Sequence, residues 1–308
     1  MTLSEKEVAE LAVVELHADL ALAEIQKRTN QRGHTIRYNL KRLEDAGIIS
    51  KAPFIDVYPL GYTGHAIFFS IAPSSSSSKE AFIESLKNHQ NVQWLAELGG
   101  DYQYVATLFV HHPSEVQDFF DAINQKFGNI LFEKTISTRL SFTQFNRKYF
   151  GGKPDSLSFG STTPQTINET DAKILSSMAN NTKLYISQTT LRFRKKRLKE
   201  KHLLLGEFYQ INAAEIGMQT HEVFLSAKGA SQSLRESLFT FSKKHKYIVH
   251  FVSCLGEWDY EIGIEVPDNQ TLLATLQEIA EKFGDQLVSM KTLSLFQNLK
   301  YSLFPFDS

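Results

Sequence analysis

The sequence predicts an α+β protein in which a winged helix-turn-helix and a ferredoxin-like βαββαβ domain are repeated twice in tandem. Three short helices are expected before residue 50, and strands alternate with helices between residues 64 and 142. Many of these features recur at one constant offset: Gly256 lies 156 residues after Gly100 (256 − 100), and Lys282 lies 156 after Lys126 (282 − 126). A shared offset over so many elements indicates a tandem duplication.

The composition is that of a globular protein with a packed core, since 42% of the 308 residues are hydrophobic and 22% are charged. The net charge is −1, so any binding to nucleic acid has to come from a local patch. Cys254 is the only cysteine, which excludes an intramolecular disulfide. No stretch approaches the roughly 18 apolar residues of a membrane span, and the N-terminal residues carry no apolar export region. We therefore expect a cytoplasmic protein with no membrane partner.

The first module, residues 1–54, is predicted to hold three helices. Ser4 and Glu7 have the spacing of a capping box, so the first helix should run from there through Val14. A second helix is expected over residues 20–28 and a polar turn over residues 30–33. A basic third helix should begin near His34 and end before Gly47. This order is that of a winged helix-turn-helix.

The third helix should bury one stripe, made by Ile36, Leu40 and Leu43, and turn its basic face outward. Such a face can donate hydrogen bonds to phosphates and base edges in the major groove of double-stranded DNA. An ordinary amphipathic helix with a solvated basic face is the other interpretation. The residues expected to contact DNA are Arg32, His34, Thr35, Arg37, Tyr38, Asn39, Lys41 and Arg42.

Residues 55–150 are predicted to form the first ferredoxin-like domain. Strands are expected over 64–71, 92–98, 102–110 and 130–142, with helices over 79–88 and 113–127. The serine run from Ser74 to Ser78 should be a flexible loop, and residues 151–166, rich in Gly, Pro, Ser and Thr, should be a linker. Residues 211–308 repeat the domain, with elements over 222–227, 231–245, 247–266, 269–283 and 287–299.

Residues 167–210 predict a degenerate second helix-turn-helix, with a first helix over 169–178. Nine residues are missing before Thr190 relative to the first copy, and Lys195 stands where the first copy has the core residue Leu40. An unpaired ammonium in a small core is costly, so this helix must be packed differently. It either holds phosphates without reading sequence or is a solvated helix that serves dimer packing. The residues expected to contact phosphates are Arg192, Arg194 and Lys196.

Several short motifs carry a resemblance to a known family. They are TIRYNLKRL (35–43), the pair Leu60–Gly61 and GDYQY (100–104), with TLRFRKKRL (190–198) and GEWDY (256–260) in the second copy. On these motifs the chain resembles the Lrp/AsnC family of transcription regulators over nearly its whole length. The resemblance implies a DNA-binding module joined to a domain for ligand sensing and oligomerisation.

The resemblance also implies that an amino-acid effector binds at the Gly-Asp hairpin turns. Turn N–H groups can bind a carboxylate while a side-chain carboxylate binds an ammonium. The residues concerned are Gly100, Asp101, Gly256, Glu257 and Asp259. The other interpretation is that these residues only form tight turns, and it is favoured for the first copy, where Gln103 replaces a frequent acid.

These observations predict a sequence-specific DNA-binding transcription regulator of Lrp/AsnC type, at least a homodimer, whose sensing domains pair within or between chains. No catalytic residue, metal site or cofactor is predicted, and the protein is not expected to be an enzyme. One alternative is a tetrapyrrole enzyme similar to the siroheme decarboxylases, which also use two such copies. Another is a co-regulator that pairs with a conventional family member. The intact basic helix favours DNA binding over the enzyme.

Overall fold

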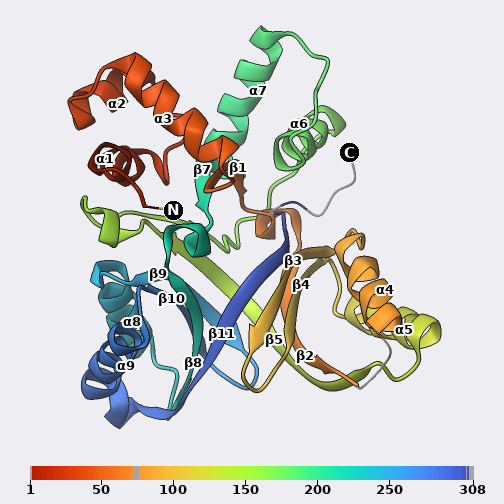
Figure 1. Cartoon of the computed structure of the whole chain (residues 1–308). Coiled ribbons are helices and arrows are strands. Elements are labelled where there is room, and N and C mark those ends of the chain that lie inside the picture. Colours follow the sequence, from red (N-terminus) through yellow and green to blue (C-terminus); the bar gives the residue numbers. More distant parts are fainter. Residues whose placement is uncertain (1, 73–75, 303, 305–308) are drawn as a thin grey trace.

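The computed structural model describes residues 2–72, 76–302 and 304, and it has two layers (Figure 1). The upper layer in Figure 1 holds the two helical modules, and the lower layer is a β structure with two pairs of helices on its outside. The elements of the upper layer are α1 (Glu5–Val14), α2 (Leu22–Thr29), α3 (Gly33–Asp45), β1 (Ile49–Ile55), α6 (Glu169–Ala179), α7 (Gln188–Glu200) and β7 (Leu204–Ile211).

The lower layer contains the two ferredoxin-like copies, which confirms the predicted fold class. The first consists of β2 (Thr63–Ile71), α4 (Ser76–Lys87), β3 (Val92–Gly99), β4 (Tyr104–Val110), α5 (Ser114–Phe127) and β5 (Leu131–Phe145). The second consists of β8 (Gln219–Ala227), α8 (Gln232–Lys244), β9 (Ile248–Leu255), β10 (Tyr260–Val266), α9 (Asn269–Phe283) and β11 (Leu287–Tyr301). Short 3-10 helices are η1 (Tyr58–Leu60), η2 (Lys148–Phe150), η3 (Ala213–Ile216) and η4 (Gly284–Gln286).

The two copies share one closed ring of strands. Its order is β2, β4, β3, β11, β8, β10, β9 and β5, and β5 then pairs with β2 again. The last strand of each copy thus pairs with an edge strand of the other, β5 with β9 and β11 with β3, all antiparallel. Closure leaves no long unpaired edge in the ring. The two ferredoxin-like domains therefore pair within one chain; the expected homodimer stays a prediction.

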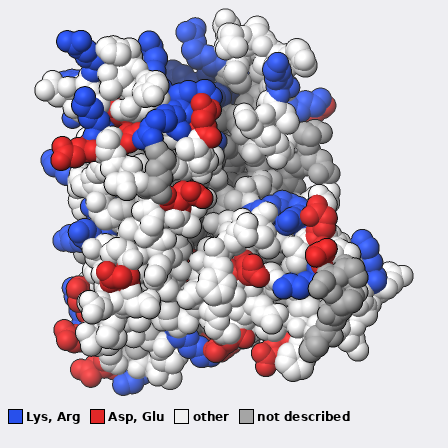
Figure 2. All heavy atoms as spheres, viewed as in Figure 1, with Lys and Arg blue, Asp and Glu red and all other residues white. Residues whose placement is uncertain are grey.

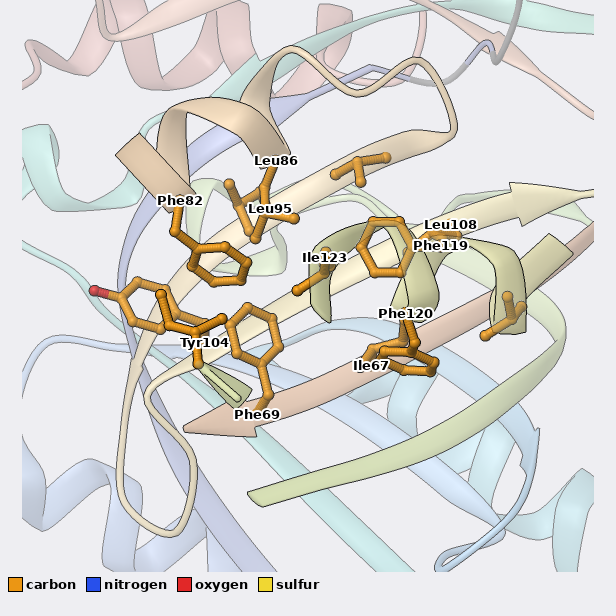
Figure 3. Packing of buried hydrophobic residues seen from close by; sticks show 14 of the residues in the cluster. Ile67, Phe69, Phe82, Leu86, Leu95, Tyr104, Leu108, Phe119, Phe120 and Ile123 are labelled. Carbon is orange, nitrogen blue, oxygen red and sulfur yellow. The ribbon is translucent and has the colours of Figure 1, made fainter. Parts of the chain in front are cut away.

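An aromatic cluster fills the space between the two sheets of the ring. The ring centroids of Phe68 and Phe224 are 5.2 Å apart, and Trp258 lies 5.1 Å from Phe68 and 4.3 Å from Phe224. On the outside, helices cover each sheet. Figure 3 shows this for the first copy, where Phe82 of α4 and Phe119 of α5 pack against strand residues. Helix pairs thus cover the outer strand faces of both copies, while Phe132, Leu140 and Phe296 of the ring strands stay exposed.

The structure adds to or changes the sequence-based expectations at three places. The strand β1 pairs with β7 of the second module, Ile49 opposite Ile211, so the wings of the two modules form one sheet. The expected linker 151–166 contains a strand, β6 (Ser156–Phe159), which pairs with β5. The Gly160 and Ser161 N–H groups after it donate to Asp56 at 3.1 and 3.0 Å. In the expected serine loop, residues 74 and 75 lie outside the described residues, whereas Ser76–Ser78 begin α4.

None of the helices in the described ranges has the length and apolar character needed to cross a membrane.

Candidate functional site

The first basic helix uses part of its expected DNA-binding face inside the protein. Ile36 and Leu43 are buried as predicted, but Asn39, expected to face outward, is only 9% exposed and donates to Glu10 Oε1 at 2.9 Å. Asn39 follows Ile36 by three residues, so it lies on the same helix face. Arg42 Nε donates to Glu7 at 2.9 Å and Lys41 Nζ to Asp45 at 2.6 Å. The residues left toward solvent are Arg32, His34, Arg37, Tyr38 and Lys41, with Thr35 half-buried.

Glu10, the partner of Asn39, is fully buried in this module. Burial raises the pKa of its carboxyl to about 7, although the Asn39 hydrogen bond opposes the shift. A carboxyl whose folded pKa is raised stabilises the fold below its unfolded pKa, near 4.5, and this contribution is lost as pH rises through 7. We expect Glu10→Gln to raise the free energy of unfolding at pH 8 by on the order of 1–3 kcal/mol, with little change at pH 4. Thermal unfolding at both pH values measures this, and a variant destabilised at pH 8 would contradict it.

The second basic helix, α7, is held largely by acids of the same chain. Lys195 Nζ donates to Glu207 at 2.9 Å, which explains how an ammonium is accommodated where the first copy has a leucine. Arg194 Nη1 donates to Asp171 at 3.2 Å. Arg192 and Lys196 are exposed. Figure 2 shows Lys and Arg side chains gathered over the helical modules at the top of the molecule.

The hairpin turns expected to bind an effector pack against the opposite copy. A Cβ at Gly100 would lie 2.5 Å from Leu293 Cδ2, and one at Gly256 would lie 2.8 Å from the Ile136 carbonyl oxygen; both glycines have positive φ. Glu257 binds Lys291 at 2.6 Å and Thr135 at 3.2 Å. Asp259 accepts from the Ala227 N–H at 2.7 Å, and Asp101 lies exposed in its turn. These residues do not line the cavity described next.

A cavity of about 950 Å³ lies between the β1–β7 sheet and the ends of the ring strands. Its size is at the upper end of that of small-molecule sites. Residues from both copies line it, and seven of them are Phe, Tyr or Trp. The aromatic residues at its wall include Trp94, Phe109, Phe142, Phe159, Phe208 and Tyr301. A wall of this kind suits a large ligand with flat apolar faces.

His221 is a polar group of the cavity wall with an unused ring nitrogen. It is 6% exposed, its Nδ1 lies 3.3 Å from Ser294 Oγ, and its Nε2 has no hydrogen-bond partner among the described residues. Burial lowers the pKa of His221, although the Glu222 charge opposes the shift, so the imidazole is neutral near pH 7. A neutral imidazole with one free nitrogen can exchange a proton with a ligand.

His250 is a second histidine of the wall, and a buried acid fixes its orientation. Its Nε2 lies 2.9 Å from Oε2 of Glu222, which is 2% exposed, and its ring centroid is 5.4 Å from that of Phe142. A Cβ at Gly263 would lie 2.1 Å from His250 Cε1, so only glycine at that position leaves room for the ring. The histidine and carboxylate thus form an oriented pair at the cavity wall.

Two arginines line the cavity, and they differ in their free donors. Arg139 Nη2 donates to Glu261 at 2.7 Å and Nη1 to Thr107 at 3.2 Å, while Nε has no partner among the described residues. Arg147 is bound by Glu15 at 2.7 Å and by both oxygens of Glu265 at 2.6 and 2.7 Å. Arg139 thus keeps one buried donor, Nε, without a partner among the described residues, whereas Arg147 ties α1 to β10.

The two copies differ beside the cavity, where a tyrosine of the first copy corresponds to an alanine of the second. Tyr58 packs its ring 6.1 Å from Phe109 and 5.8 Å from Phe159 and donates its hydroxyl to the Arg139 carbonyl at 2.6 Å. At the constant offset of 156, its counterpart is Ala214, which lines the cavity. The aromatic ring that closes the space in the first copy is thus absent from the second.

The sequence analysis singled out none of these cavity residues. His221, Glu222, His250 and Arg139 are isolated polar residues within strands, and no motif spacing connects them. Comparison of the two copies contains a signal, because Glu222 corresponds to Ala66 at the offset of 156 (222 − 66). A buried acid that replaces a small apolar residue costs stability unless it has a partner or a role.

Comparison with solved structures places this fold among known proteins. No protein-family model matches the sequence, and no curated protein matches it. A structure of the siroheme decarboxylase NirDL with an iron-uroporphyrin III analogue is similar over 98% of this chain and 94% of that chain, with a TM-score of 0.60 and 14% identity. A second NirDL structure covers 99% and 95%, also with a TM-score of 0.60 and 14% identity. At this identity the likeness shows the fold.

Structures of transcription regulators are similar to a smaller part of this chain. An AsnC family transcriptional regulator from Agrobacterium tumefaciens is similar over 44% of this chain and 89% of that chain, with a TM-score of 0.40 and 14% identity. The expectation of a DNA-binding regulator that is not an enzyme is contradicted, because the structures that match nearly the whole chain are those of an enzyme. The engagement of Asn39, Lys41 and Arg42 by acids of the same module is a physical reason why a basic helix alone was a poor guide.

Proposed function

We propose that this protein is an enzyme that removes carboxylate groups from a tetrapyrrole, in the manner of a siroheme decarboxylase. The observation that carries the proposal is the aromatic cavity with His221 and Arg139 at its wall, in a tandem fold similar to NirDL. A tetrapyrrole has two flat apolar faces and acidic side chains at its rim. The aromatic residues match its faces, and the free Nε donor of Arg139 matches a rim carboxylate.

The proposed reaction is redox-neutral. The bond between a side-chain carbon and its carboxylate breaks, CO2 leaves, and the electron pair left on that carbon takes up one proton. His221 is the group we assign to deliver this proton from Nε2, in the tautomer that carries it there. Ser294 Oγ, 3.3 Å from Nδ1, can pass a proton to the other ring nitrogen in the same event, so the ring ends neutral. Solvent then returns the proton to Ser294.

The oriented pair of Glu222 and His250 serves a second purpose in this scheme. The ring of His250 borders Phe142 and is fixed by a 2.9 Å contact to Glu222, so it offers a rigid polar edge beside the aromatic wall. We assign it to orienting the macrocycle, because a side chain held by two neighbours loses little freedom when a ligand binds.

Binding of a tetrapyrrole is the most direct test. Titration of the purified protein with iron-uroporphyrin III should change the visible absorption of the porphyrin and saturate at one ligand per chain, since residues of both copies line the same cavity. Incubation with siroheme should then release CO2, followed by mass spectrometry of the tetrapyrrole. An unchanged spectrum at micromolar concentrations, together with no loss of mass, would refute the proposal. Saturation at two ligands per chain would contradict the single-site assignment alone.

A further inference from the structure

Glu261 is a fully buried acid between the two sheets of the ring, and it accepts four hydrogen bonds. Its relative exposure is 0%. One oxygen accepts from Arg139 Nη2 at 2.7 Å. The other accepts from Trp258 Nε1 at 3.1 Å, Ser137 Oγ at 3.3 Å and Cys254 Sγ at 3.4 Å. Burial and the Glu261 charge raise the pKa of the Cys254 thiol, so the thiol stays protonated and can donate. Glu261 is therefore a fully satisfied carboxylate in an otherwise apolar interior.

The fold has no need of a charged pair at this place. Taking two charges out of water is costly, and apolar residues of similar size often stabilise a fold as well or better. This chain contains that apolar version: at the offset of 156, Val105 corresponds to Glu261 (261 − 105) and Leu295 to Arg139 (295 − 139). Both pack in the same intersheet cluster as Phe68 and Trp258. The ion pair of Glu261 and Arg139 thus corresponds to a valine and a leucine at the duplicate place.

Both places border the cavity, since Leu295 lines it as Arg139 does, but only the Arg139 side brings a guanidinium there. Glu261 and Thr107 bind the two terminal nitrogens of Arg139, and the guanidinium carbon lies 5.1 Å from the ring centroid of Trp94. These contacts fix the plane of the guanidinium and leave Nε as the donor without a partner among the described residues. A guanidinium held in this way presents its free donor in one direction, so a ligand carboxylate loses less entropy on binding.

We propose that Glu261 is a positioning residue, which from between the sheets holds Arg139 ready to receive a carboxylate of the ligand. This inference rests on the proposed function, because it takes the ligand to be a carboxylated tetrapyrrole. Glu261 itself does not line the cavity. Its role is to set the orientation of Arg139 and to supply the countercharge that keeps the guanidinium stable when the cavity is empty.

The test compares two probes, iron-uroporphyrin III and the same compound with every acid group methyl-esterified. In Glu261→Gln we expect the dissociation constant of the acid probe to rise about 10- to 100-fold and that of the ester to change less than about threefold. A purely structural defect would weaken both probes equally. The matched control is Glu10→Gln, which changes a buried acid that does not line the cavity and should leave both constants unchanged.

A second variant tests the proposal in case Glu261→Gln does not fold. Arg139→Leu with Glu261→Val reproduces the pair found in the duplicate copy, so it should keep the thermal midpoint and lose the preference for the acid probe. If the wild type binds neither probe, the proposed function fails and this inference fails with it. If the wild type prefers the acid probe and both variants retain that preference, only the positioning role of Glu261 is overturned.

Discussion

Replacing His221 with alanine should lower kcat for carboxylate removal by about 10²- to 10⁴-fold, the range that a positioned acid or base contributes. His221 is the cavity histidine whose Nε2 has no partner among the described residues, and no other ring in the proposed scheme can deliver the proton. The dissociation constant for iron-uroporphyrin III should change little, because the aromatic wall and Arg139 remain. Single-turnover release of CO2 from siroheme, together with a binding titration, separates the two effects.

His65 provides the matched control for this prediction. It corresponds to His221 at the offset of 156, is also buried, and binds Thr63 Oγ1 at 3.0 Å and Thr138 Oγ1 at 3.1 Å. It does not line the cavity, and burial lowers its pKa as it does for His221. The His65→Ala variant should therefore keep kcat within about threefold of wild type. Equal losses of kcat in the two variants, or none in His221→Ala, would remove His221 from the proton-donor role.

Replacing Ala214 with tyrosine should weaken binding of iron-uroporphyrin III on the order of 100-fold or more. The tyrosine would restore at the second copy the residue that closes the same space in the first, where Tyr58 packs on Phe109 and Phe159. A ligand that fills a preformed cavity cannot share it with a ring, and the lost contact area is not regained elsewhere. Ala214 is exposed in the free protein, so the fold should tolerate the change.

Serine at the same position is the control, because it adds one atom and no ring. Ala214→Ser should bind the porphyrin within about threefold of wild type, and both variants should keep the thermal midpoint of unfolding. The absorption titration described above measures the affinities. If the tyrosine variant binds as the wild type does, the ligand does not occupy the space beside η3, and the site has to be sought elsewhere on the chain.

Local sequence patterns were sufficient for most single elements. The helix expected over 269–283 has those bounds in α9, because Asp268 accepts from the Thr271 N–H at 2.7 Å and caps its start. The duplication predicted two like domains, and both are present. The pairing of β1 with β7 was not predictable in this way, because a strand partner more than 100 residues distant leaves no mark on local periodicity. The strand β6 pairs with the nearby β5, but it is short and lies in a segment rich in Gly, Pro, Ser and Thr, so the composition indicated a linker.

The candidate site was not predictable from the sequence because its residues are also far apart along the chain. Arg139, His221 and His250 lie on three strands of the ring, β5, β8 and β9, and meet only when the ring closes. The basic charges of α3 are neighbours in the sequence, so they were easy to recognise and led to the prediction of DNA binding. Asn39 was predicted to contact DNA, but its hydrogen bond to Glu10 joins two helices and contributes to the packing of the module.

The closed ring also constrains how the chain can fold. Trp94 and Tyr301 are opposite each other in the β3–β11 ladder although 207 residues separate them (301 − 94). Until the second copy has been synthesised, β3 of the first copy has one edge without a partner, and so has the end of β5. The ladders that complete the ring are therefore the last to form, with a large loop-closure entropy, and the two copies should unfold as one cooperative unit. A chain cut between them would expose both edges at once and would be prone to aggregate.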